Sequence, residues 1–183
     1  MENTTKKPTE TNKSMNPQSS EDVINQKKID RHIEKLKSNQ NLPLGFFIGL
    51  IASIVGAILW AAITVATEYQ IGYMAIAIGL LVGYVIRYSG KGIDNIFGIS
   101  GAVLSAFACL LGNFLSIIGF AANEEELGYL ETLRLIDYSI IPEIMVSTFN
   151  PIDVLFYGIA IYEGYKFSFR KISEDELLEV INN

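Results

Sequence analysis

The chain has 183 residues, of which half are apolar and only 19% are charged, and its formal net charge is −6. A soluble domain carries roughly 25% charged residues, whereas the stretch from 43 to 66 here carries none. The chain has one cysteine, Cys109, so no intrachain disulfide can form. A structural zinc site needs about four ligands, and Cys109 and the one histidine, His32, cannot supply them. We therefore expect an all-α integral membrane protein that holds no cofactor and no metal.

The N-terminal region divides into two parts. Residues 1–22 are polar, lack the apolar run of a secretory signal peptide and hold too little apolar surface to fold, so we expect a disordered tail. Over residues 23–41 we expect a short amphipathic basic helix, because Ile29, Ile33 and Leu36 are spaced as one helical face among basic residues. Such a helix either is solvated and leads into the membrane or lies on anionic lipid headgroups.

Four apolar segments follow, each long enough to be a transmembrane helix, since about 20 apolar residues cross the hydrocarbon core. The first two are joined by only a few residues, which predicts a tight antiparallel hairpin, and we expect the last two to form a second one. The last segment is the most polar, because Asp153, Glu163 and Lys166 interrupt it. We predict a transmembrane domain over 42–169, a four-helix bundle with spans at 42–66, 71–88, 96–122 and 151–169.

Two polar segments complete the chain. Residues 123–150 form an acidic connection with one base, Arg134, and their leucines have helical spacing, which predicts a short surface helix that Pro142 interrupts. Residues 170–183 are polar and acidic and contain a capping-box-like sequence at 173–176, so we expect a short helix there.

Basic residues near the ends of spans mark the cytoplasmic side of a membrane protein. With four spans, the N-terminal tail, the turn at 88–95 and the C-terminal tail lie on one side, and that side carries every basic residue except Arg134. We therefore place both termini in the cytoplasm and the acidic connection outside.

Small residues recur at about every fourth position in the spans, which lets neighbouring helices approach closely within a bilayer. This pattern predicts a compact bundle; the alternative is that the glycines line a substrate path or break a helix. We expect Cys109 to be a buried small residue, Asn113 and Ser116 to hydrogen-bond across helices, and Trp60 to lie near the headgroups. The candidate packing residues are Gly49 and Ser53 in the first span, Ala75, Gly79 and Gly83 in the second, Gly101 in the third, and Gly158 and Gly164 in the fourth.

Ionisable residues inside a span are costly and are candidates for function. Glu163 is the clearest case, and Lys166, three residues later, or Arg87, at the cytoplasmic end of the second span, can pair with it. The group is either an ion pair that clamps two helices or a carboxylate that binds a proton or an ion.

Glu68 and Asp153 flank the outer ends of the first and last spans. Asp153 lies in the first turn of its helix, where the helix dipole favours an anion. Together with the acidic connection they either form an outer mouth that attracts cations or only keep the helix ends in water.

No catalytic motif is recognisable. The sequence Ser89-Gly90-Lys91-Gly92 has neither the spacing nor the preceding strand of a phosphate-binding loop, and no Ser/His/Asp set is present. We expect a protein that is not an enzyme.

The stretch Gly72-Tyr73-Met74-Ala75, followed by Gly79 and Gly83 in one helix, resembles a group of small uncharacterised bacterial four-helix inner-membrane proteins. The segment 153–165 resembles their last span. The resemblance covers about residues 43–170, implies a bacterial inner membrane and brings no activity.

These observations favour a non-enzymatic scaffold or accessory subunit that lies in the lipid bilayer. It would associate with further copies of itself or with a membrane-protein partner, and not with nucleic acid. The alternative is a small oligomeric channel or ion-coupled transporter that uses Glu163.

Overall fold

The structure is a computed structural model that describes residues 17–69, 72–148 and 150–182. Within these ranges the chain is all-α, and no strand occurs. The chain divides into two compact units, residues 36–171 and a smaller unit formed by the two ends of the chain, and each is described by itself.

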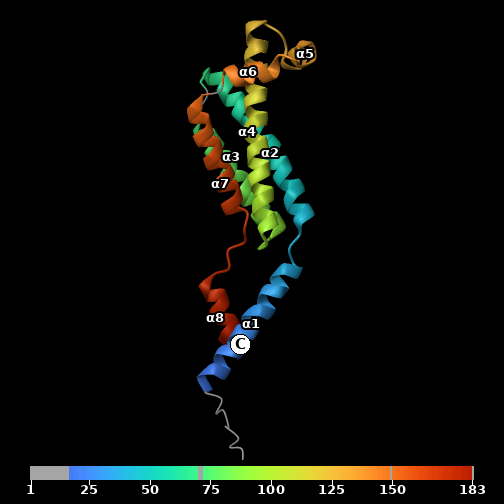
Figure 1. Ribbon diagram of the computed structural model, residues 1–183. Coiled ribbons are helices and arrows are strands. Elements are labelled where there is room, and N and C mark those ends of the chain that lie inside the picture. The colour runs from blue at the N-terminus through green and yellow to red at the C-terminus, as the bar shows by residue number, and fades with distance from the viewer. Residues whose placement is uncertain (1–16, 70–71, 149, 183) are drawn as a thin grey trace, which may run out of the picture. The chain divides into compact units, whose positions relative to one another are not determined.

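The larger unit is built from four long helices (Figure 1): α2 (Leu42–Thr67), α3 (Tyr73–Gly90), α4 (Asn95–Glu124) and α7 (Pro151–Phe167). Both α2 and α7 pack against α3 and α4, and α3 contacts α4 as well. Two short helices, α5 (Tyr129–Leu135) and α6 (Ile141–Ser147), contact α4. Each long helix begins and ends within a residue or two of a predicted span.

Three helices, α2, α3 and α4, are long and apolar enough to cross a membrane. A fourth crossing is counted only if α6 and α7, whose axes differ by 101°, form one bent span. These helices are compatible with a multi-pass membrane protein.

Local sequence explains where the long helices begin and end. The side chain of Asn41 accepts a hydrogen bond from the N–H of Leu44, 3.0 Å away, and caps α2. Pro43 lies in the first turn of α2, where a missing N–H costs nothing. Lys91 takes the left-handed conformation, with φ of 49°, and its N–H bonds the carbonyl of Arg87 to end α3.

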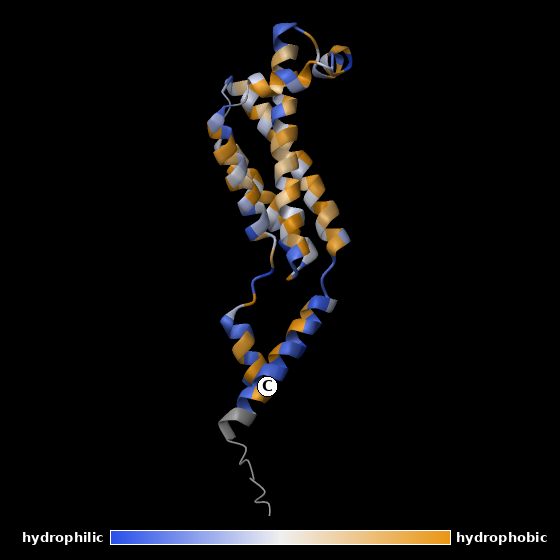
Figure 2. Ribbon diagram, viewed as in Figure 1, coloured by the Kyte–Doolittle hydropathy of each residue, from blue (hydrophilic) through white to orange (hydrophobic). Residues whose placement is uncertain are grey.

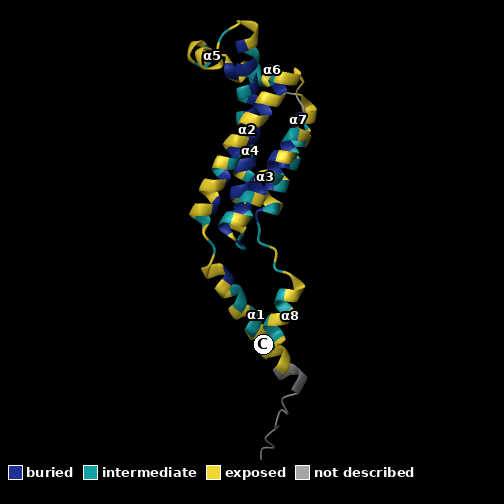
Figure 3. Ribbon diagram, turned by 180° about the vertical axis from the view of Figure 1, so that it is seen from behind, coloured by how far each residue is buried: buried dark blue, intermediate teal, exposed yellow. Residues whose placement is uncertain are grey.

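The outer surface of the long helices is strongly apolar (Figures 2 and 3). Large apolar side chains are more than half exposed on this surface, among them Phe47, Ile51, Val103 and Leu155. A water-soluble monomer rarely exposes contiguous apolar patches of this kind, so the surface agrees with insertion into lipid. The interior of the unit is formed by large side chains from several helices, among them Trp60, Ile78, Val82, Ile86, Phe97 and Leu104.

Small residues bring the helix backbones into contact. A Cβ added to Gly79 of α3 would lie 2.8 Å from the Cα of Ala160 in α7, closer than real Cβ atoms approach. A Cβ on Gly164 of α7 would lie 2.6 Å from the carbonyl oxygen of Gly101 in α4. The prediction of small-residue packing therefore holds for α3, α4 and α7 at these positions. Gly49, Ser53, Ala75, Gly79, Gly83, Gly101 and Gly164 are all buried.

Gly158 is the exception, and its predicted packing role is wrong. It is exposed, and a Cβ placed on it would meet nothing within 4 Å. The contact surface of α7 runs instead through Ala160 and Gly164, which lie on another side of the helix.

The smaller unit contains most of α1 (Pro17–Ser38) together with α8 (Glu174–Asn182). Helix α1 begins at Pro17, so residues 17–22, expected to be disordered, are helical. The rest of the expected disordered tail, residues 1–16, lies outside the described residues.

Candidate functional site

Glu163 is half-buried on α7 and does not form the expected ion pair. Two ion pairs within the described part of the chain join His32 to Glu176 and Lys37 to Asp94, and neither involves Glu163. The two bases expected beside Glu163 lie near aromatic rings instead. The Nζ of Lys166 is 5.3 Å from the ring centroid of Tyr162, and the Cζ of Arg87 is 6.0 Å from that of Tyr88. These are cation–π distances, and neither base forms an ion pair with Glu163 in the structure.

Asp153 is a capping residue. Its carboxylate accepts the backbone N–H of Asn150 at 2.9 Å, while the Asn150 side chain accepts the N–H of Ile152 at 3.2 Å. This reciprocal capping box fixes the start of α7, as a carboxylate in the first turn favours. Asp153 is only 6% exposed, whereas Glu68 is exposed at the left-handed residue that ends α2. A buried, engaged carboxylate does not suit the predicted outer mouth.

A cluster of polar and aromatic side chains is buried between the long helices, next to the C-terminal halves of α2 and α4. Trp60, which was expected near the headgroups, is 1% exposed, and its ring stands edge-on to that of Tyr157 at 6.2 Å. Gly112 of α4 leaves room for the indole, because a Cβ there would lie 3.1 Å from it. Asn113 lies in the same region and faces the hydroxyl of Tyr157. Of this cluster, Trp60 and Asn113 were singled out from sequence, whereas Tyr157 and Gly112 were not.

Two buried polar atoms of α2 have no hydrogen-bond partner within the described residues, the indole N–H of Trp60 and the hydroxyl of Thr64. Ser116 does not bond across helices as expected, because its hydroxyl donates to the carbonyl of Gly112 one turn back. Ser53 does, since its hydroxyl is 2.9 Å from the carbonyl of Gly49 and 3.2 Å from that of Leu104 in α4.

The turn between α3 and α4 is held by the segment that precedes α2. Gln40 donates from its amide nitrogen to the carboxylate of Asp94 and accepts the N–H of Ile93 at 3.1 Å. The N–H of Asn41 donates to the carbonyl of Gly90 at 2.8 Å. The hydrogen bond from Gln40 and the nearby Lys37 ammonium lower the pKa of Asp94 below its ordinary value of 3.8. Nothing in the sequence pattern singled out Gln40.

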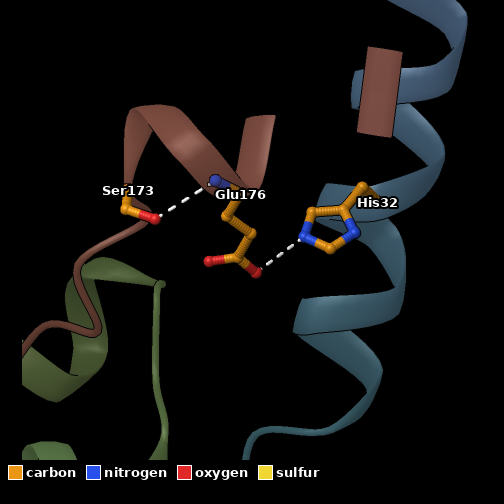
Figure 4. Close-up of polar contacts among 3 residues, drawn as sticks. All are labelled: His32, Ser173 and Glu176. Carbon is orange, nitrogen blue, oxygen red and sulfur yellow. Dashed lines mark hydrogen bonds and ion pairs between the residues drawn. The ribbon is translucent and has the colours of Figure 1, made fainter. Parts of the chain in front are cut away.

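Helix α1 contacts the chain's own C-terminal helix within the smaller unit. His32 Nε2 lies 2.8 Å from Glu176 Oε1 (Figure 4), and Lys28 Nζ donates to the carbonyl of Ile181 at 2.7 Å. Lys28 precedes His32 in α1, whereas its partner Ile181 follows Glu176 in α8. The two helices therefore run antiparallel. The carbonyl of Ile181 is one of the last in α8, where a cation is favourable. In this structure α1 thus contacts protein, a choice between lipid and protein that the sequence had left open.

An apolar groove of about 760 Å³ lies between the C-terminal halves of α2 and α4. Tyr129 of α5 also lines the groove, and its hydroxyl donates to the carbonyl of Leu115 in α4 at 3.0 Å. Burial at this contact raises the pKa of Tyr129. Among the lining residues are Ile54, Ile58 and Ala62 of α2, Leu111 and Leu115 of α4, and Leu127.

No group of three His, Cys, Asp or Glu side chains that could hold a metal ion occurs within residues 17–69, 72–148 and 150–182. No protein-family model, curated protein or solved structure matches the chain. The resemblance to small bacterial inner-membrane proteins therefore stays a prediction.

Proposed function

We propose that the protein crosses a bacterial inner membrane four times and acts as a non-enzymatic scaffold or accessory subunit for other membrane components. Helix α7 serves as the fourth crossing in this proposal. Its 17 residues span roughly 25 Å at about 1.5 Å per residue, and about 17 residues is the shortest length that crosses the hydrocarbon core. The contacts of α7 with α3 and α4 support this role.

The orientation follows from the basic residues. In a four-crossing chain, α1, the turn at 90–94 and α8 lie on one side, and every base except Arg134 belongs to that side or to a helix end next to it. Basic residues are retained on the cytoplasmic side. Both termini are therefore cytoplasmic in this proposal, and α5 and α6 are outside.

The observation that carries the scaffold proposal is the close packing of the helix backbones. A Cβ on Gly45 of α2 would lie 3.0 Å from the Cα of Gly90 in α3. Contacts of the same kind join Gly79 to Ala160 and Gly101 to Gly164 at other levels of the unit. Packing this tight leaves no room for an ion path through one copy of the chain, whereas it suits a rigid body that presents its outer surface to partners.

One observation favours the alternative of an oligomeric channel or ion-coupled transporter. Glu163 is half-buried within a span and has no ion-pair partner within the described residues. A carboxylate in this setting is costly to retain without a role. A path past Glu163 would have to run between copies of the chain, because the interior of one copy is filled.

Gentle detergent extraction from the native membrane, followed by native mass spectrometry, tests the scaffold proposal. A stable complex with other membrane proteins is the expected result. Recovery of a homo-oligomer alone, together with an ion flux in liposomes that Glu163→Gln abolishes without unfolding the protein, would replace it with the transport alternative. Glu174→Gln, which removes an exposed carboxylate on α8, is the matched control.

A further inference from the structure

The groove between α2 and α4 has the length of one membrane leaflet. Its lining begins at Ile54 and ends at Ala66 on α2, and it begins at Leu111 and ends at Asn123 on α4. Each stretch rises about 18 Å at about 1.5 Å per residue, against roughly 15 Å for half of the 30 Å hydrocarbon core. Within the proposed topology both helices run outward here, so the groove spans the hydrocarbon of the outer leaflet.

The groove is hollow because small side chains form part of its lining. Ala62 and Ala66 of α2 are exposed and line it, together with Gly119 and Ala122 of α4. A Cβ on Gly119 would lie 2.5 Å from Val65, which shows how closely α4 approaches α2 at this level. The small side chains thus leave a long apolar groove that is open toward the lipid.

Tyr129 lies in the groove partway along its length, and this decides between occupants. Its hydroxyl is fixed on the carbonyl of Leu115, roughly 12 Å inward of Asn123 at about 1.5 Å per residue. A partner transmembrane helix, which is about 10 Å across, would collide with Tyr129 if it lay along the groove. An acyl chain is thinner and flexible and can follow the groove past the ring. The obstruction therefore suits a lipid and not a helix.

The charge beside Asn123, at the acidic end of the groove, selects among lipids. Glu124, Glu125 and Glu126 follow directly after the lining residue Asn123 and are exposed, and the C-terminus of α4 adds its negative dipole end. Arg134 is the one base between residues 123 and 150. An anionic headgroup would be repelled here, whereas a headgroup that carries an amine would be attracted.

We propose that the groove between α2 and α4 binds one acyl chain of a zwitterionic, amine-bearing phospholipid such as phosphatidylethanolamine. The headgroup of this lipid lies beside residues 123–126. This inference rests on the proposed insertion into a membrane and adds a lipid site to it.

The test uses the full chain purified in mild detergent and exposed to equal amounts of phosphatidylethanolamine and phosphatidylglycerol. Retained lipid is then counted by native mass spectrometry. We expect retention of the amine lipid over the anionic one by about fivefold, the ratio that one charge contact at a membrane surface supplies. Ala62→Phe fills the groove and should abolish retention. Val55→Phe adds the same ring to an exposed position of α2 outside the groove, and it should change nothing.

A triple variant, Glu124→Gln, Glu125→Gln and Glu126→Gln, should keep the bound lipid and lose the preference for the amine. Equal retention of the two lipids by the unsubstituted chain, or undiminished retention by Ala62→Phe, would overturn the inference. So would a bound second protein chain that Ala62→Phe releases. Recovery of the chain in the soluble fraction of lysed cells would contradict the membrane proposal itself, whereas a membrane-bound chain without selective lipid contradicts only the lipid site.

Discussion

Gly79 and Ala160 bring the backbones of α3 and α7 into direct contact, since a Cβ on Gly79 would lie 2.8 Å from the Cα of Ala160. Gly79→Ala is therefore expected to force α3 and α7 apart and to lower the free energy of unfolding by about 1–3 kcal/mol, as overpacking does. Gly158→Ala provides the matched control on α7, because nothing lies within 4 Å of the added Cβ. Alanine there should be neutral or stabilise the helix by up to about 1 kcal/mol.

Thermal unfolding in detergent, followed by circular dichroism, measures the two glycine variants side by side. The expected order of midpoints is Gly158→Ala at or above the unsubstituted protein and Gly79→Ala clearly below both. Equal midpoints for the two variants would show that α3 and α7 do not touch at Gly79.

The Gln40–Asp94 contact makes the turn between α3 and α4 sensitive to acid. The Gln40 hydrogen bond and Lys37 lower the pKa of Asp94 in the folded state below its ordinary value of 3.8. A depressed pKa means that the contact contributes stability above the unfolded pKa and loses it as the pH falls through the folded pKa. We expect hydrogen exchange at the Ile93 amide, which donates to Gln40, to be constant from pH 7 to about pH 5 after correction for intrinsic rates, and to rise below about pH 4.

Asp94→Asn removes the charge and should abolish this acid response. If exchange at Ile93 rises below pH 4 to the same extent in the variant, a different group controls the turn. Asp137 serves as the comparison for Asp94, because hydrogen bonds from Ser139 lower its pKa as well, at a separate place in the chain.

The pairing of α1 and α8 depends on His32 and Glu176. Glu176→Gln weakens the contact to His32 and leaves the Lys28 contact in place, so α8 should lose part of its protection from hydrogen exchange. Glu174→Gln removes a neighbouring acid in the same first turn of α8, where the structure places an exposed side chain. We expect the exchange rate of α8 amides to rise several-fold more with Glu176→Gln than with Glu174→Gln, because the His32–Glu176 contact is a charge-assisted hydrogen bond when His32 is protonated.

A disulfide cross-link tests the pairing of α1 and α8 independently. The chain has one cysteine, the buried Cys109, so a His32→Cys and Glu176→Cys pair introduced into Cys109→Ala can form only its own disulfide within a chain. Efficient oxidation would support the contact between α1 and α8 at His32 and Glu176. Failure of the pair to oxidise, with α8 exchange unaffected by Glu176→Gln, would show that the helices separate in solution.

Hydropathy and small-residue spacing were enough to place the long helices and most of their contact residues. They failed where a contact depends on the neighbour. Gly158 fits the small-residue pattern, but the pattern cannot tell which side of α7 meets α3 and α4. Trp60 was placed by its position toward the end of its span, but that position does not show that Gly112 leaves room for the indole between the helices.

Long-range contacts could not be predicted either, because they too depend on the neighbour that folding brings alongside. Gln40 meets Asp94 across 54 residues, and His32 meets Glu176 across 144, and a single sequence carries no signal of either pairing. Glu163 shows the opposite error, because nearness in sequence suggested a pair with Lys166 that the structure does not form. Helical spacing permits such a pair, but a nearby aromatic ring competes for the cation.

The crossing of the membrane by α7 is the central claim, since orientation, lipid site and scaffold role all depend on it. Single cysteines placed in Cys109→Ala at Asn95, Gly128 and Glu174 report the side of each connection to a membrane-impermeant thiol reagent applied to intact cells. The account predicts that only Gly128→Cys reacts from outside, and that Asn95→Cys and Glu174→Cys react after the membrane is opened. Reaction of Glu174→Cys in intact cells would contradict the account, because it would leave α7 on the outer side and the chain with three crossings.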